Sequence, residues 1–437
     1  MTATILTPTD LRSACEAFTE SRGTIRIQGA GTAATWAGTA GTADVVVDTT
    51  GLAGIRSYNP ADMTVSVGAG TPLAQLQDEV SRNGQRVAFD AARVRRGATV
   101  AGLIATADSG PLALGYGSMR DLVIGATVVL ADGTPARTGG HVIKNVAGYD
   151  LAKLMHGSYG AYGLMTEVVL RLHPAPEVQR TVALDCTLSE ASGHTRSLLA
   201  EAHEPVSVEW ADGTLLIRIE GTADGTAART RALAELTGGR ALSDDEAAES
   251  WQRHVRLVDD ATVRIGCRPS RLPGVLGRFH TQAVAGLATG VATLSVPAAQ
   301  VGDVHEVVTE AGGTSVTRGA TEGQVPAWGQ QPSALRVLQA VKHELDPAFR
   351  LDSGRFGTWL EPAAVASAGT GTRDTSTGAA PSVAASRAEP RERGTSGGEK
   401  VRGAAEPNGP TLGTASRTRK PTSPGGTGSA GTEQEDS

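Results

Sequence analysis

The sequence predicts an α+β protein of two folded domains followed by a disordered tail, and three observations support this prediction. Beyond residue 176, strands and helices alternate in two β-α-β-like units, a pattern typical of an α+β domain built on an antiparallel sheet. The folded part, residues 1 to about 362, has the length of two domains. Residues 369–437 contain no aromatic residue and only three aliphatic residues beyond alanine, so they bury too little apolar surface to offset roughly 1–2 kcal/mol of ordering entropy per residue.

The predicted first domain begins with a helix over residues 8–21, which Thr9 or Asp10 caps. A second helix begins at Thr71-Pro72, with the threonine as its cap and the proline in its first position, and it ends at Asn83-Gly84. Short runs rich in β-branched residues predict strands at 24–28, 44–48, 54–58, 63–67, 122–130, 134–138 and 164–172.

The second domain follows residues 173–176, His-Pro-Ala-Pro, which predict a domain boundary. Its predicted strands are 181–186, 206–210, 214–220, 262–267, 292–296 and 314–317. Its predicted helices are 188–202, 223–236, 272–283 and 299–311. A last helix over 333–345 completes the folded part.

Composition excludes several classes of protein. The three cysteines, Cys15, Cys186 and Cys267, stand alone, which excludes a disulfide scaffold and an iron–sulfur site of the Cys-x-x-Cys kind. No apolar run approaches the ~18–20 residues that span a bilayer, and no secretory signal is visible. A net charge of −6 argues against a nucleic-acid surface. We expect a cytoplasmic protein with no metal site.

Glycine-rich loops are the candidate binding elements. Residues 28–34 match G-x-G-x-x-A after a strand, but a poor helix follows, so a Rossmann fold is disfavoured; a phosphate-binding nest and a plain turn both stay open. Residues 97–117 predict a loop of small, flexible residues that would let the backbone approach a large, flat ligand. Residues 139–163 form the third loop, with a short helix at 149–156, and four of the five tyrosines fall between 116 and 162.

These loops carry a resemblance to a known family. Lys144–Pro176 (KNVAGYDLAKLMHGSYGAYGLMTEVVLRLHPAP), Gly115–Gly133, Val67–Val80 and Leu335–Arg355 resemble the FAD-binding domain of the vanillyl-alcohol oxidase/PCMH-type flavoproteins. Within that superfamily the chain resembles the FAD-binding subunit of bacterial glycolate oxidase. The resemblance implies a two-lobed PCMH-type FAD-binding domain at 1–176 and a smaller cap domain with an antiparallel sheet at 177–332. A segment at 333–362 would return to the first domain, and 363–437 would form the disordered tail.

The resemblance also implies a cofactor site for FAD. The pyrophosphate would lie along residues 28–32 and 97–117, and the isoalloxazine near residues 163–166. Relatives with covalent flavin carry a histidine where this chain has Thr32-Ala33, so we expect FAD to bind without a covalent link. The implied cofactor-binding residues are Gln28, Gly29, Ala30, Gly31, Thr32, Ala98, Thr99, Ala101, Gly102, Ala105, Gly110, Tyr116, Gly117, Asp121, Gly163, Met165 and Glu167.

The implied function is oxidation of a small 2-hydroxy acid, glycolate by resemblance, to the 2-oxo acid. Electrons would leave through partners, a larger FAD-containing subunit and an iron–sulfur subunit, which could hold the chain at the inner membrane face. Candidates for binding the substrate carboxylate are Arg120, Lys144 and Arg355, and candidates for accepting the hydroxyl proton are His141, Tyr149 and His156.

Departures from the family pattern keep alternatives open. The second loop lacks a glycine and an asparagine that the family often has, and Asp352 stands where the family usually has asparagine. The cap lacks the histidine motif of related 2-hydroxy-acid dehydrogenases, and its His280 and His305 are isolated. A non-catalytic or electron-relaying scaffold, and an oxidase of another hydroxy acid, are therefore alternatives.

Overall fold

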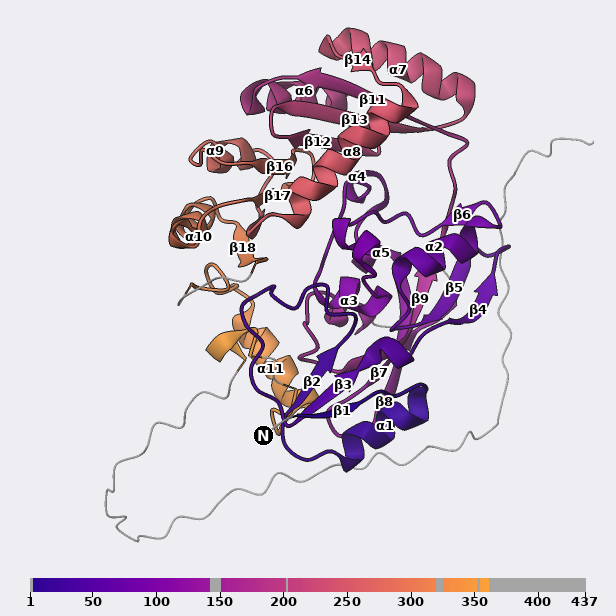
Figure 1. Ribbon diagram of the computed structural model, residues 1–437, viewed down its shortest axis with the longest axis vertical. Helices are drawn as coiled ribbons and strands as arrows, with labels where there is room; N and C mark the ends of the chain where they lie inside the picture. Colours follow the sequence, from indigo (N-terminus) through magenta and orange to yellow (C-terminus); the bar gives the residue numbers. More distant parts are fainter. Residues whose placement is uncertain (1–2, 142–150, 202, 320–324, 352–353, 361–437) are drawn as a thin grey trace, which may run out of the picture. The chain divides into compact units, whose positions relative to one another are not determined.

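The computed structural model describes residues 3–141, 151–201, 203–319, 325–351 and 354–360, all within one compact unit, Met1–Ala366. The predicted tail at 363–437 lies outside the described residues. The predicted α+β class is confirmed, because antiparallel sheets and separate helices make up most of this unit (Figure 1). Helices and strands occur at most of the positions that the sequence predicts.

Three sheets form the N-terminal region among the described residues. A parallel sheet has the strand order β1-β3-β2, where β1 was not predicted, and a small antiparallel sheet pairs β6 (Gln85–Arg86) with β10 (His173–Pro174). The largest sheet is antiparallel, has the order β4-β5-β9-β7-β8 and buries its apolar residues against α2 (Leu73–Ser81), α3 (Val100–Ala105) and α5 (Met119–Leu122). The strands are β1 (Thr4–Leu6), β2 (Ile25–Gln28), β3 (Val45–Asp48), β4 (Ile55–Asn59), β5 (Thr64–Gly68), β7 (Val123–Val129), β8 (Pro135–Gly139) and β9 (Leu164–Arg171).

Helix α1 (Leu11–Glu20) forms because Ala14, Ala17 and Phe18 recur on one buried face and because Asp10 caps it, accepting from the Ser13 amide at 2.7 Å. Helix α2 (Leu73–Ser81) buries Leu73, Leu76 and Val80, as predicted. The predicted cap of α2 is wrong. The Thr71 hydroxyl instead donates to the Gly68 carbonyl at 2.7 Å and accepts from the Gly54 amide at 2.9 Å, so Pro72 precedes the helix without a side-chain cap.

The loop predicted at 97–117 contains two short helices. Helix α3 (Val100–Ala105) begins at Thr99, whose hydroxyl accepts from the Gly102 amide at 3.2 Å, and α4 (Ala113–Tyr116) and α5 (Met119–Leu122) follow. The residues Val100, Leu103 and Ile104 point into the core at helical spacing. A short helix needs little intrinsic propensity when packing buries its apolar face, so the small residues misled the prediction.

The second region is an eight-stranded antiparallel sheet with the order β14-β11-β13-β12-β16-β17-β15-β18. Its strands are β11 (Val178–Asp185), β12 (Ser207–Ala211), β13 (Thr214–Gly221), β14 (Arg240–Ala241), β15 (Val263–Gly266), β16 (Ala283–Gly286), β17 (Val291–Leu294) and β18 (Thr314–Thr317). Its helices are α6 (Leu188–Ala200), α7 (Ala223–Thr237), α8 (Asp244–Asp259), α9 (Leu272–Leu276) and α10 (Val301–Glu310). Three predictions fail here: α8 and the short strand β14 were missed, and the helix expected at 272–283 ends early and gives way to β16.

The chain then returns to the N-terminal region. Helix α11 (Leu335–Leu345) carries Lys342, whose buried ammonium donates to the Ala161 carbonyl at 3.0 Å and to Asp346 at 2.6 Å. Arg350 donates to the Ala131 carbonyl at 2.7 Å and to the Phe18 carbonyl at 3.0 Å. These charged groups satisfy carbonyls that loops would otherwise leave unpaired, and so they fix the last described segment against the first region.

Candidate functional site

The glycine-rich loop after β2 opens onto a cavity of about 400 Å³, here called the glycine cavity. Its walls come from the loop, from α3 and its N-terminus, and from the start of β9. They include Arg26, Gln28, Gly29, Ala30, Gly31, Thr32, Ala33, Ala34, Thr99, Ala101, Gly102, Ala105, Thr106, Tyr159, Gly163, Met165, Arg93 and Arg355. The three candidate loops of the sequence therefore supply one continuous wall, although they are far apart along the chain.

Glycine residues, which have no side chain, determine the shape of the glycine cavity. A Cβ placed on Gly29 would lie 2.9 Å from the Thr99 hydroxyl, so this backbone and the start of α3 approach closely only with glycine. Gly31 has φ +71° with open space around its Cβ position. Backbone amides in such a loop are exposed donors that suit an anion.

A buried cluster of arginines lies beside this cavity. The guanidinium carbons of Arg93 and Arg318 lie 4.1 Å and 3.9 Å from the centroid of the Trp36 ring. Asp108 accepts from Arg93 at 2.9 Å and lies 3.5 Å from Arg318. Burial lowers the pKa of Arg318 to about 10, an effect that Asp108 opposes. Arg318 therefore stays protonated near neutral pH, and the Asp108 carboxylate faces two buried guanidinium groups.

Arg93 also ties the loops together, since it donates to Thr32 at 2.9 Å and to Thr106 at 2.7 Å. Arg355 acts similarly. It donates to the Ala34 carbonyl at 2.8 Å and to the Gly38 carbonyl at 3.1 Å, and burial lowers its pKa. Arg355 therefore supports the glycine-rich loop from the C-terminal segment, and the structure does not place it among the other predicted catalytic residues.

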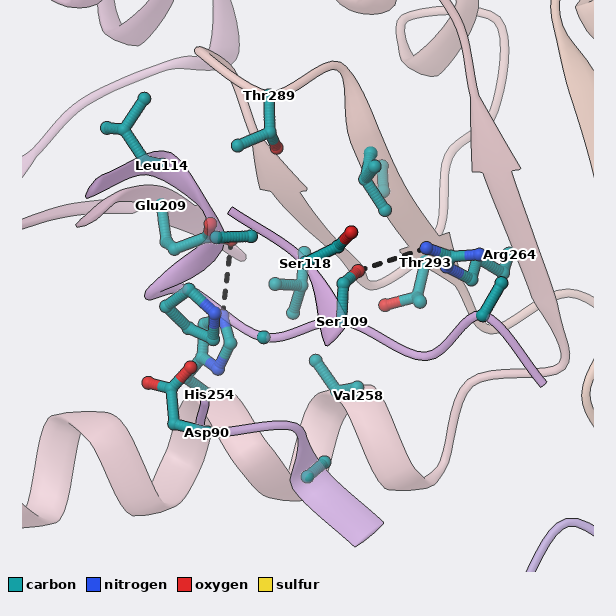
Figure 2. A pocket seen from close by; sticks show the side chains of 18 of the residues that line it. Asp90, Ser109, Leu114, Ser118, Glu209, His254, Val258, Arg264, Thr289 and Thr293 are labelled. Atoms are coloured by element: carbon teal, nitrogen blue, oxygen red, sulfur yellow. Dashed lines mark hydrogen bonds and ion pairs between the residues drawn. The ribbon is translucent and has the colours of Figure 1, made fainter. Parts of the chain in front are cut away.

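A second cavity of about 450 Å³ lies between the N-terminal region and the eight-stranded sheet. We call it the interdomain cavity after the two domains that the sequence predicts. Its polar and charged lining comes from both sides: Asp90, Ser109, Ser118, Asp121, His156, Glu209, His254, Arg264, Thr289, Thr293 and Arg318. Figure 2 shows His254 with Glu209 and Asp90 toward one end and Arg264 with Thr293 toward the other, with Ser109 between them. The segment 105–109 lines both cavities, with Ala105 and Thr106 in the first and Ala107 and Ser109 in the second.

Two histidines in the interdomain cavity differ in their partners. His254, 3% exposed, has its Nε2 3.3 Å from the Glu209 carboxylate. Half-buried His156 has no hydrogen-bond partner for its Nε2 among the residues described. Burial, reinforced by Arg264 and Arg120, lowers the pKa of His156 to about 4, so this imidazole is neutral near pH 7. Arg264 donates to the Ser109 hydroxyl at 3.0 Å.

Comparison with known proteins agrees with this geometry. Residues 2–139 match the family model described as an FAD binding domain. The chain carries a PCMH-type FAD-binding domain. This flavoprotein is 28% identical over 322 residues to glycolate oxidase subunit GlcE of Escherichia coli (strain K12), which covers 69% of the chain and 84% of that protein.

Two further matches are narrower. Over 123 residues the flavoprotein is 41% identical to glycolate oxidase subunit GlcD of Bacillus subtilis (strain 168), which covers 28% of the chain and only 26% of that protein. A crystal structure of alkyldihydroxyacetonephosphate synthase shares the fold, with a TM-score of 0.57 and 14% identity over 79% of this chain and 75% of that one. The predicted family resemblance, the FAD cofactor and the oxidoreductase class are confirmed.

The residues present fit FAD. The glycine cavity offers backbone donors and the buried charge of Arg93, which Asp108 neutralises only in part because it also pairs with Arg318, and these groups suit phosphates. These residues would hold the dinucleotide, which supplies a two-electron acceptor when bound. The sequence predicted a phosphate-binding nest as one alternative for residues 28–34 but did not single out Arg93 or Arg318. Arg93 is one of several arginines in 93–96, and Arg318 lies more than two hundred residues further along the chain.

Most of the implied cofactor-binding residues line the two cavities. Those in the glycine cavity are Gln28, Gly29, Ala30, Gly31, Thr32, Thr99, Ala101, Gly102, Ala105, Gly163 and Met165, and those in the interdomain cavity are Gly110, Gly117 and Asp121. Ala98, Tyr116 and Glu167 line neither of these cavities. The Tyr116 hydroxyl instead donates to Glu220 at 2.8 Å, and Glu167 accepts from Ser66.

The remaining predicted residues lie elsewhere. Lys144, Tyr149 and Asp352 are outside the described residues. His141 and Arg120 are exposed and line neither cavity. Of the cap histidines, His305 is buried and bonded to Ser315 at 2.7 Å, whereas His254, on the helix that was missed, lines the interdomain cavity.

In the part of the chain that the structure describes, no helix is long and apolar enough to cross a membrane. No group of three or more His, Cys, Asp or Glu side chains in these ranges is placed to bind a metal ion.

Proposed function

We propose that the flavoprotein is the FAD-binding subunit of a glycolate oxidase type of complex, in which a small 2-hydroxy acid is oxidised to the 2-oxo acid. The observation that carries this proposal is the segment 105–109, which lines both cavities. FAD held by its phosphates in the first cavity would extend along this segment toward the second. The substrate would then bind in the interdomain cavity, where Arg264 offers a charge that suits a carboxylate.

Electrons would leave through partner subunits, a larger FAD-containing subunit and an iron–sulfur subunit. Likeness to two glycolate oxidase subunits supports a multi-subunit assembly. The three free cysteines also sit on different elements, Cys15 on α1 and the others after β11 and β15, so they do not form a cluster site. We further propose that FAD binds without a covalent link, since Thr32 and Ala33 at the glycine cavity offer no histidine.

The test is to purify the full chain and record its flavin spectrum with and without glycolate under anaerobic conditions. Bleaching of the flavin bands by glycolate alone supports direct oxidation by this subunit. Bleaching only after addition of the partner subunits supports an electron-relaying role. A colourless chain that shows no spectral shift with added FAD contradicts the proposal and favours a non-catalytic scaffold, whereas bleaching by other 2-hydroxy acids only would reassign the substrate.

A further inference from the structure

The interdomain cavity contains a histidine–carboxylate pair that the sequence did not reveal. His254 on α8 and Glu209 on β12 lie in this cavity with side chains 4% and 9% exposed, and their Nε2 and Oε2 atoms are 3.3 Å apart. A carboxylate only accepts, so Nε2 carries the hydrogen and the neutral ring keeps its lone pair on Nδ1. Nδ1 is buried and has no hydrogen-bond partner among the described residues.

The positively charged side chain of Arg264 lines the same cavity and has hydrogen-bond donors that are not used by any described residue. Arg264 on β15 donates through one nitrogen to Ser109 at 3.0 Å, and no carboxylate pairs with it in the described part of the chain. The other charged groups there are committed: Asp90 to Arg218 at 2.9 Å, Arg318 to Asp108, and Asp121 to Ser118. Arg264 therefore retains the donors that a substrate carboxylate needs.

We propose that Arg264 binds the carboxylate of the 2-hydroxy acid and that Nδ1 of His254 accepts its hydroxyl proton, with Glu209 as the positioning residue. This inference rests on the proposed function. In the reaction the α C–H and the O–H bonds break and a C=O bond forms. Bound, oxidised FAD would supply the acceptor for the hydride with its two electrons, and the remaining proton would go to His254.

His254 suits this task better than His156, the histidine that the sequence put forward. The Glu209 carboxylate stabilises the imidazolium that forms when His254 takes the proton, by the same logic as a carboxylate behind a catalytic histidine. His156 faces positive charge instead, and burial with Arg264 and Arg120 lowers its pKa to about 4. A proton arriving on His156 would meet repulsion.

The first test uses the full chain with bound flavin, together with its partner subunits if these are required for bleaching. His254→Gln should lower the rate of flavin reduction by about 10²–10⁴-fold, the range for loss of a general base. The matched control is His280→Gln, an exposed histidine of the same sheet domain that lines neither cavity, and it should keep the wild-type rate. Equal rates for wild type and His254→Gln, or a loss confined to His156→Gln, would overturn the assignment.

The second test measures binding without turnover. Oxalate, a dicarboxylate that cannot be oxidised here, is titrated into the chain by calorimetry. Arg264→Met should weaken its binding about 10- to 100-fold, as for a charged hydrogen bond, with Arg264→Lys in between. The exposed Arg268→Met should bind oxalate like the wild type. Unchanged oxalate affinity in Arg264→Met would refute the carboxylate site.

A comparison of rate and binding separates a positioning role of Glu209 from a structural one. Glu209→Gln removes the negative charge beside His254 but keeps an oxygen that can accept from Nε2, so the rate of flavin reduction should fall while oxalate affinity stays at the wild-type value. An unchanged rate, or a lower rate accompanied by equally weakened oxalate binding, would contradict the role of Glu209.

The outcomes also distinguish this inference from the proposed function. If none of the 2-hydroxy acids bleaches the flavin of the wild type, either with or without partner subunits, then the proposed function fails. If wild type bleaches and the His254 and Arg264 variants behave like their controls, then only the present inference fails.

Discussion

The Arg93–Asp108–Arg318 cluster gives the sharpest prediction, because two substitutions in one ion pair should act alike on stability and oppositely on FAD. Asp108→Asn leaves two buried guanidinium groups without their carboxylate, and Arg93→Met leaves Asp108 with Arg318 alone, 3.5 Å away. Loss of one partner from a buried pair costs about 3–5 kcal/mol, so both apoproteins should lose stability of that order.

The two variants differ in the charge that the FAD phosphates would meet. Arg93→Met removes a cation and its bonds to Thr32 and Thr106, so FAD affinity should fall about 10- to 100-fold, the range for a charged hydrogen bond. Asp108→Asn removes the competing anion, so FAD affinity should hold or rise. FAD at about 100 times its Kd adds about 2.7 kcal/mol of stability, so saturating FAD should rescue Asp108→Asn more than Arg93→Met.

The assay is urea unfolding of the apoproteins, followed by FAD titration monitored by quenching of flavin fluorescence. The control is Arg12→Met, which removes an exposed ion pair to Glu16 and should leave the unfolding free energy close to the wild-type value. Equal weakening of FAD binding by Arg93→Met and Asp108→Asn would refute the reasoning, because it would make the cluster a purely structural element.

Three further predictions follow from other residues. Burial lowers the pKa of His156 from its ordinary value of 6.5 to about 4, so between pH 6.5 and 4 the unfolded chain binds a proton that the folded chain does not, and stability falls as the pH falls. His156→Gln should reduce this loss of stability, measured as urea midpoints from pH 7 to 4. An unchanged dependence of the midpoints on pH would contradict the prediction. Tyr116→Phe should leave FAD affinity unchanged and cost about 0.5–1.5 kcal/mol for the lost bond to Glu220; weaker FAD binding would restore Tyr116 to the cofactor site. Deletion of residues 370–437 should leave the flavin content per chain intact, and loss of flavin would move the predicted domain boundary.

Local sequence signals predicted most of the fold. Helix α1 follows from its apolar spacing and from Asp10, and the hairpin β12–β13 from two apolar runs around Asp212-Gly213. Predictions failed where tertiary packing outweighs composition. The buried side chains of Val100 and Leu103 stabilise a short helix in a glycine-rich segment. Strand β16 forms because β12 and β17 pair with it on either side.

The candidate site was predictable where one short segment carries it and not where separate segments meet. The glycine-rich loop has its own signature, and its residues line one cavity. Arg318 and Asp108 are 210 positions apart, and His254 and Glu209 are 45 apart, so each charge looks like an ordinary surface residue in sequence. Burial distinguishes these residues, because a charged side chain that is removed from water must be paired. A buried charged or polar side chain that is incompletely paired therefore indicates a binding site for a charged ligand. Arg93 lines the glycine cavity and Arg318 lines the interdomain cavity, and both pair with Asp108. The criterion therefore selects Arg264 and His254, which both come from the region of the eight-stranded sheet, so this region would take part in binding the substrate.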